Sequence, residues 1–238
     1  MKLFTTTLSV LSSILLFSCN NGSSTNEAEI KDTTTTAPVE TKVEKPAFQP
    51  FKVVVIQHKV NNFQKAHDGY FKRDSLLRAY GLTHFSMGRL QKDSNTIFII
   101  DKVEDVDKSR AFFKDEKVKA TMKKAGVHSD PGYTYAEIIR YNEPASSSPY
   151  RLAVTHHVKD FSAWLQAFDS KAADRTANGM NEMAVARNFD DSNTVSVLFA
   201  ITDTAKAKAR MASPEVKKIM ADAGVDTPPA IRWYKEVE

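Results

Sequence analysis

Hydrophobic and polar residues alternate in short stretches along most of the chain, and stretches with helical spacing separate them. From Leu152 to Val158, every second residue is apolar apart from His156, which is typical of a half-buried strand. Asp160 follows at a position suited to a helix N-cap, and apolar side chains then recur at helical spacing from Phe161 onward. The pattern therefore predicts a strand followed by an amphipathic helix.

The pattern continues with three more strands and a second helical region. Gly179 and Gly224 stand where helices are expected to end. Ser213, followed by a proline, has the sequence of a fresh helix start. The remaining elements predicted here are strands at 183–189, 195–201 and 231–237, and a helix that begins after Asp203.

An earlier part of the chain repeats this segment without a gap, at a shift of 98 residues that places His58 on His156. The tetrapeptide Asp-Ser-Asn-Thr and the tripeptide Ala-Gly-Val each occur twice at this same shift. A repeat longer than a solenoid unit indicates a whole duplicated domain. In the first copy, the predicted elements are strands at 53–60, 85–90, 97–103 and 133–141, a helix at 63–80, and a helix from Asp105 to Gly126.

Each copy has the β-α-β-β-α-β order of the split βαβ, or ferredoxin-like, arrangement, which is an α+β fold. We assign residues 51–143 to the first domain and 144–238 to the second, with a linker at 142–149. A single sheet covered by helices on one side leaves an apolar face open, which soluble monomers seldom tolerate. The two copies are therefore expected to cover each other as an intramolecular pseudo-dimeric α+β barrel, monomeric in solution.

Four motifs carry a resemblance to known proteins: Val154-Thr155-His156, Asp160-Phe161-x-x-Trp164, Arg187-x-x-Asp190-Asp191-x-Asn193, and the stretch from Ser213-Pro214-Glu215 to Ala223-Gly224-Val225. They resemble the dimeric α+β barrel superfamily, which includes antibiotic-biosynthesis-monooxygenase-like and muconolactone-isomerase-like domains. The resemblance covers nearly all of residues 51–238. It implies the fold given above and leaves activity open, because one fold hosts unrelated chemistries.

The N-terminal residues have the features of an export signal. The apolar stretch from Leu8 to Phe17 is shorter than the roughly 20 residues that span a bilayer. It ends in Leu-Phe-Ser-Cys19, which resembles the lipobox of bacterial lipoproteins and implies cleavage before a lipid-modified Cys19. Residues 1–19 are thus predicted as a lipoprotein signal peptide, and the polar residues 20–50 as a disordered tether.

The lipid would place the mature protein on a membrane of the cell envelope. Asn20 follows the cysteine, where some Gram-negative inner-membrane lipoproteins have aspartate, and this favours the outer membrane facing the periplasm. Cys19 is the only cysteine, so the folded part can contain neither a disulfide nor a thiol catalyst.

Positive charge is concentrated in the first copy, which has 17 basic and 12 acidic residues against 12 and 12 in residues 144–238. A lipid-binding or scaffold surface is one interpretation, and a solvated helix face is the favoured one because acidic residues are interspersed. No nucleic-acid motif accompanies the charge, so we expect no nucleic-acid partner. The basic residues of this helical region are Lys108, Arg110, Lys114, Lys117, Lys119, Lys123 and Lys124.

The repeated histidines, His58 and His156, are the first candidate site residues. An imidazole on a strand could serve as a general base or a ligand anchor, whereas a hydrogen-bonded histidine within the core is the favoured interpretation. Trp164 occurs only in the second copy, where core packing is the default role for an aromatic residue at this spacing. His157 should point to the opposite face from His156, which argues against a metal pair.

Arg89 and Arg187 precede the two predicted hairpin turns. Each could bind a ligand carboxylate, but pairing with the turn residue Asp93 or Asp191 is the favoured role. The chain has no glycine-rich phosphate loop, no zinc-ligand spacing and no serine-nucleophile motif, so no metal and no cofactor are expected.

The sequence favours a small-molecule-binding lipoprotein over an enzyme, because the fold can enclose an apolar cavity between its sheets without a catalytic constellation. The alternatives are a cofactor-independent monooxygenase or isomerase, as the superfamily resemblance implies, and an interaction or scaffold protein of the envelope. The second copy, with His156, Trp164 and Arg187, is the preferred location of a site, while His58 and Arg89 leave the first copy as the alternative.

Overall fold

The computed structural model describes residues 47–144 and 146–237. The predicted signal peptide, the lipobox Cys19 and nearly all of the predicted tether lie outside these residues. Repeat one consists of β1 (Phe51–Lys59), α1 (Phe63–Phe71), α2 (Asp74–Ala79), β2 (Leu82–Leu90), β3 (Thr96–Val103), α3 (Val106–Lys114), α4 (Glu116–Lys124) and β4 (Gly132–Tyr141). Repeat two consists of β5 (Tyr150–His157), α5 (Phe161–Asp169), α6 (Ala172–Ala177), β6 (Met180–Asn188), β7 (Thr194–Ile201), α7 (Thr204–Ala212), α8 (Pro214–Asp222) and β8 (Ala230–Val237).

Side-chain caps start the helices at the positions that the sequence indicates. The Asp160 carboxylate accepts a hydrogen bond from the backbone N–H of Ala163 at 2.7 Å, and Asp203 caps α7 in the same way. Ser213 ends α7 and caps α8, which confirms the predicted fresh start. Among the described residues, no helix is long and apolar enough to cross a bilayer.

Each predicted helical region of repeat one is divided into two helices. The helix expected over residues 63–80 is interrupted between α1 and α2. The second region breaks at Asp115, whose extended backbone ends α3 while its carboxylate accepts the N–H of Lys117 at 2.7 Å and so caps α4. Asp115 is equivalent to Ser213 of repeat two at the shift of 98 residues. In both repeats, a short polar residue at this position ends one helix and caps the next.

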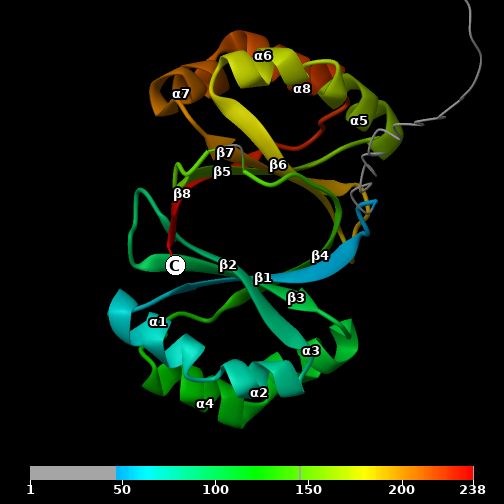
Figure 1. Cartoon of the computed structure of the whole chain (residues 1–238). Helices are drawn as coiled ribbons and strands as arrows, with labels where there is room; N and C mark the ends of the chain where they lie inside the picture. Colours follow the sequence, from blue (N-terminus) through cyan, green and yellow to red (C-terminus); the bar gives the residue numbers. More distant parts are fainter. Residues whose placement is uncertain (1–46, 145, 238) are drawn as a thin grey trace, which may run out of the picture. The chain divides into compact units, whose positions relative to one another are not determined.

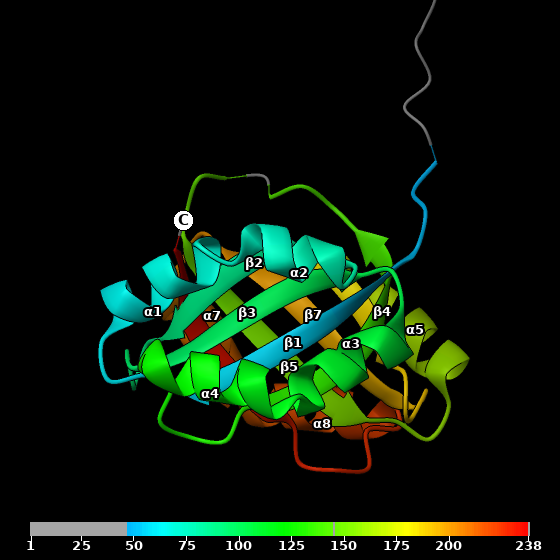
Figure 2. The same ribbon diagram turned by 90° about the horizontal axis from the view of Figure 1, so that it is seen from below.

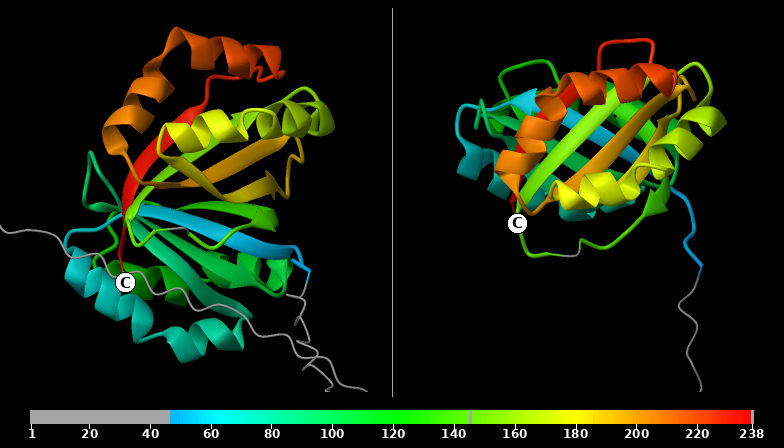
Figure 3. Two further views of the ribbon diagram at one scale, coloured as in Figure 1. Left: turned by 45° about the horizontal axis from the view of Figure 1, so that its top comes forward. Right: turned by 90° about the horizontal axis from the view of Figure 1, so that it is seen from above.

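All eight strands form one closed barrel in the order β1-β3-β2-β8-β5-β7-β6-β4. Every neighbouring pair is antiparallel, and two pairs join the repeats: β2 with β8, and β4 with β6. Figures 1 and 3 show the two half-barrels facing each other, with the helices of each repeat on the outside. The predicted α+β fold, with two ferredoxin-like repeats paired within one chain, is confirmed.

The strands present one face to the helices and the other to the barrel interior. In repeat two, Leu152, Val154 and His156 share the buried face that packs under the helices. Figure 2 shows the corresponding arrangement in repeat one, where α1 to α4 lie across the strands. The interior contains a separate cluster with residues from both repeats, among them Val53 and Ala184. Through this cluster, side chains of the two repeats contact each other inside the barrel.

Candidate functional site

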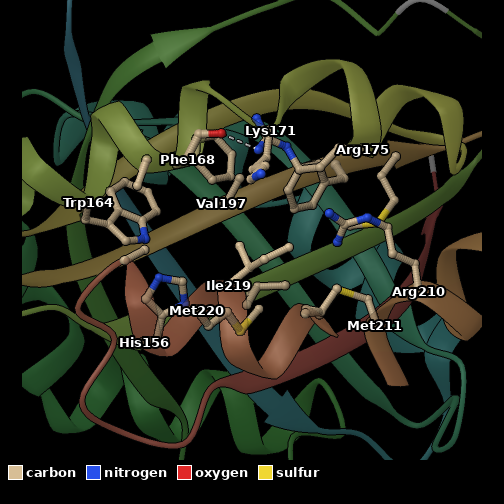
Figure 4. A pocket seen from close by; sticks show the side chains of 16 residues that line it. His156, Trp164, Phe168, Lys171, Arg175, Val197, Arg210, Met211, Ile219 and Met220 are labelled. Atoms are coloured by element: carbon tan, nitrogen blue, oxygen red, sulfur yellow. Dashed lines mark hydrogen bonds between the residues drawn. The ribbon is translucent and has the colours of Figure 1, made fainter. Parts of the chain in front are cut away.

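Two cavities lie between the sheet and the helices, one in each repeat. The cavity of repeat two measures about 70 Å³ and that of repeat one about 30 Å³. The sequence-based expectation was an apolar cavity between the sheets, whereas these two cavities lie on the helix-covered face of each sheet. Figure 4 shows the repeat-two cavity, with side chains from β5, α5, α6, α7 and α8 converging on it.

His156 forms one end of the repeat-two cavity. The residue is 6% exposed, and neither ring nitrogen has a hydrogen-bond partner among the described residues. Burial lowers the pKa of His156 from 6.5 to about 4, so the imidazole is neutral at pH 7. A buried polar group without a partner requires an explanation, and a ligand in the adjoining cavity would supply the missing hydrogen bond.

Aromatic side chains form the wall beside His156. The Trp164 ring meets the imidazole edge-on at 5.6 Å between centroids and stacks on Phe168 at 5.1 Å. Trp164 is 2% exposed, so it belongs to the core, as the sequence predicted, and also lines the cavity. Flat aromatic walls of this kind favour an apolar, planar ligand.

Two arginines lie at the other end of the cavity, beyond the aromatic wall (Figure 4). The Arg175 guanidinium lies over the Phe168 ring at 3.5 Å from its centroid. Arg210 donates through Nε to the Asp174 carboxylate at 2.9 Å. The repeat-two cavity therefore combines an apolar middle, a neutral histidine and a cationic end.

The repeat-one cavity has a different polar group. His58 is 4% exposed, its Nδ1 has no partner among the described residues, and burial and the charge of Arg73 lower its pKa to about 4. Tyr70 lines the same cavity and donates its hydroxyl to the fully buried Asp101 at 2.5 Å. Because the Tyr70 hydroxyl already donates its hydrogen bond to Asp101, it is not available as a donor to a ligand in this smaller cavity.

The two predicted arginines before the hairpin turns do not line either cavity. Arg89 donates through Nε to the carbonyl of Ser94 at 2.7 Å, and Arg187 donates in the same way to Ser192 at 2.8 Å. Each guanidinium also lies over the phenylalanine that begins the first helix of its repeat. They hold the turns, as favoured from the sequence, but through a backbone carbonyl and not through the turn aspartate.

Asp93 and Asp191 instead accept the hydroxyl of the threonine three residues later, at 2.8 and 2.6 Å. His157, predicted to point away from His156, contacts Asp226 at 2.7 Å. Among residues 47–144 and 146–237, no group of three or more His, Cys, Asp or Glu side chains could hold a metal ion.

Sequence reasoning missed Arg175 and Arg210, although the duplication contains a signal for them. At the shift of 98 residues they replace Leu77 and Phe112, which are both buried core residues. A charged residue at a position that the other copy fills with a large apolar one indicates a changed environment. Comparing the copies position by position would therefore have pointed to this end of the cavity.

Similar solved structures are ferredoxin-fold proteins of the monooxygenase-like type. An anthrone oxidase-like protein is similar with a TM-score of 0.52 and 11% identity, over 79% of this chain and 92% of that chain. A candidate monooxygenase from Fusobacterium nucleatum gives a TM-score of 0.50 and 10% identity, over 79% and 93%. A ferredoxin-fold protein from Listeria monocytogenes, related to antibiotic biosynthesis monooxygenases, is similar with a TM-score of 0.45 and 12% identity. The match covers 80% of this chain and 97% of that chain.

Each repeat is less than half of the chain, so these matches span both repeats. At such low identities they show the fold alone. No protein-family model matches the sequence, and no curated protein matches it.

Proposed function

We propose that this protein binds a small, largely apolar molecule in the repeat-two cavity. The observation that carries the proposal is His156, a buried imidazole with two unpartnered ring nitrogens beside an apolar cavity of about 70 Å³. The exposed Lys171 is at the rim, so the cavity reaches the surface. Met211 and Met220 line it, and unbranched thioether side chains repack readily around a ligand larger than the resting space.

A cavity-filling substitution tests the proposal with 2-naphthol, which has an apolar body and one hydroxyl, as the probe. Val197 is 2% exposed and lines the repeat-two cavity, so Val197→Phe should fill that space. We expect wild-type protein to bind 2-naphthol by calorimetry and to show quenching of tryptophan fluorescence. The V197F variant should bind at least about tenfold more weakly, a loss of about 1.4 kcal/mol.

Ile99→Phe is the matched control, because Ile99 has the equivalent position and lines the repeat-one cavity. This variant should bind 2-naphthol as wild type does. If V197F bound the probe unchanged while I99F lost binding, the site would be in repeat one. If both variants bound it unchanged, neither cavity would be the site.

Catalysis is the second candidate function, and the same histidine favours it. A ring nitrogen facing a bound substrate could take a proton, as a monooxygenase or isomerase of this fold would require. The lowered pKa of His156, about 4, makes it a weak base at pH 7, so the geometry supports binding better. The anthrone oxidase-like neighbour supplies a substrate to test: oxygen uptake with anthrone above the buffer rate would establish an enzyme.

We also propose that the protein is held at the cell envelope by lipid on Cys19, as the lipobox resemblance implies. Replacing Cys19 with alanine removes the only thiol that could be acylated. The variant should move from the membrane pellet to the soluble fraction or remain as uncleaved precursor, as followed by immunoblotting of fractionated cells. Ser12→Ala, within the same signal, should remain membrane-bound, and a C19A protein that did likewise after normal processing would contradict the proposal.

A further inference from the structure

The cationic end of the repeat-two cavity distinguishes it from its partner in repeat one. Arg175 and Arg210 both line this cavity, and their side chains are 7% and 10% exposed. The equivalent residues of repeat one, Leu77 and Phe112, pack in its core. Two arginines at core positions carry a large desolvation cost, which a ligand of opposite charge would offset.

The protein satisfies the Arg175 guanidinium only in part. Nη1 donates to the carbonyl of Phe168 at 2.5 Å, and Nη2 is 3.6 Å from the Glu182 carboxylate. Nε is buried and has no partner among the described residues. The Nε–H of this buried cation is therefore left for an acceptor outside the protein.

The nearby carboxylates are already engaged by other arginines. Glu182 accepts two hydrogen bonds from Arg140, at 2.7 and 3.1 Å, which are shorter than its contact with Arg175. Asp174 pairs with Arg210, and its side chain is 48% exposed, so water screens its charge. Of the charged groups here, Arg175 is the least compensated.

We propose that Arg175 and Arg210 form a carboxylate-binding subsite, so that the ligand of the repeat-two cavity is an apolar organic acid. This inference rests on the proposed function and adds the charge of the ligand to it. The carboxylate would accept the free N–H of Arg175, a charge-assisted hydrogen bond in a place that water reaches poorly. The ligand's apolar body would lie against Trp164 and the methionines.

The protonation state of the subsite agrees with this assignment. Burial lowers the pKa of Arg175 to about 10, and the neighbouring Glu182 offsets part of that effect. The guanidinium therefore stays charged at pH 7 and can attract an anion.

Two probes of the same shape test the proposal: 2-naphthoate, which is an anion, and 2-naphthamide, which is neutral. Calorimetry should show that wild-type protein binds 2-naphthoate at least about tenfold more tightly than 2-naphthamide. Arg175→Met should abolish this preference and leave the affinity for 2-naphthamide within about twofold. Arg73→Met, which changes the arginine lining the repeat-one cavity, should keep the wild-type preference.

The outcomes separate this inference from the proposed function. If wild type binds both probes equally, or if R175M keeps the preference, the carboxylate subsite is wrong while the apolar site stands. If neither probe binds and 2-naphthol does not bind either, both proposals fail, whereas binding of 2-naphthol alone would overturn only the carboxylate subsite. Should R175M not fold, as judged by circular dichroism, the affinities for 2-naphthoate and 2-naphthamide are compared in Arg210→Met instead. This variant should also lose the preference for the anion.

Discussion

Replacing Arg151 with methionine is expected to lower the free energy of unfolding by about 3 kcal/mol. Arg151 lies in β5, its side chain is 5% exposed, and it forms an ion pair with Glu236 of β8. The same carboxylate accepts the hydroxyl of Ser86 in β2 at 2.8 Å. This network crosses the junction between the repeats, and removing the cation leaves the Glu236 carboxylate, whose side chain is 29% exposed, without its charge partner.

Urea denaturation at pH 7, followed by circular dichroism, measures the change. Arg78→Met is the matched control, because Arg78 pairs with Asp74 at 2.7 Å on an exposed helix surface, where water screens the ion pair, and the variant should be nearly as stable as wild type. The double variant R151M/E236M should recover part of the loss, since no unpaired charge remains. An R151M protein as stable as R78M would show that the network does not hold the junction.

Acidification from pH 7 to pH 5 is expected to destabilise the protein by about 2 kcal/mol for each of the two buried histidines. Burial lowers the pKa of both His58 and His156 from 6.5 to about 4, and the positive charge of Arg73 adds to the effect at His58. As the pH falls below 6.5, these histidines become protonated in the unfolded chain but stay neutral in the folded protein. Stability therefore declines between about pH 6.5 and pH 4.

The double variant H58M/H156M separates this contribution from that of other titrating groups. Methionine is uncharged at every pH, so the difference in unfolding free energy between pH 7 and pH 5 should shrink by about 4 kcal/mol relative to wild type. His128→Met, on an exposed residue, serves as the control and should keep the wild-type dependence. An unchanged pH dependence in H58M/H156M would mean that the folded protein protonates these rings readily.

Local pattern was enough to predict most of the secondary structure. Alternation of apolar residues identified the strands, and the caps Asp160, Asp203 and Ser213 identified helix starts, because a short polar side chain satisfies free N–H groups wherever a helix begins. The break at Asp115 was missed in repeat one, although its aspartate has the same capping chemistry as Ser213. The duplication then predicted the pairing of the repeats, since one half-barrel cannot cover its own open face.

The candidate site was predicted only in part. Periodicity placed His156 on a buried strand face, but a period of two cannot tell whether that face meets helices or the other repeat. The cavity was expected between the sheets, whereas the cavity that His156 lines lies under the helices. For His58, too, the period of two could not tell whether its strand face meets helices or the other repeat.

The sequence by itself determined the strand and helix order, the duplication and the paired barrel, because these follow from local spacing and from the need to bury apolar faces. Only the tertiary structure decided the chemistry of the cavity. Arg175 and Arg210 belong to α6 and α7, while their nearest partners come from β6, α5 and α6. Burial and charge compensation depend on which elements meet in space, and no local pattern along the chain contains that information.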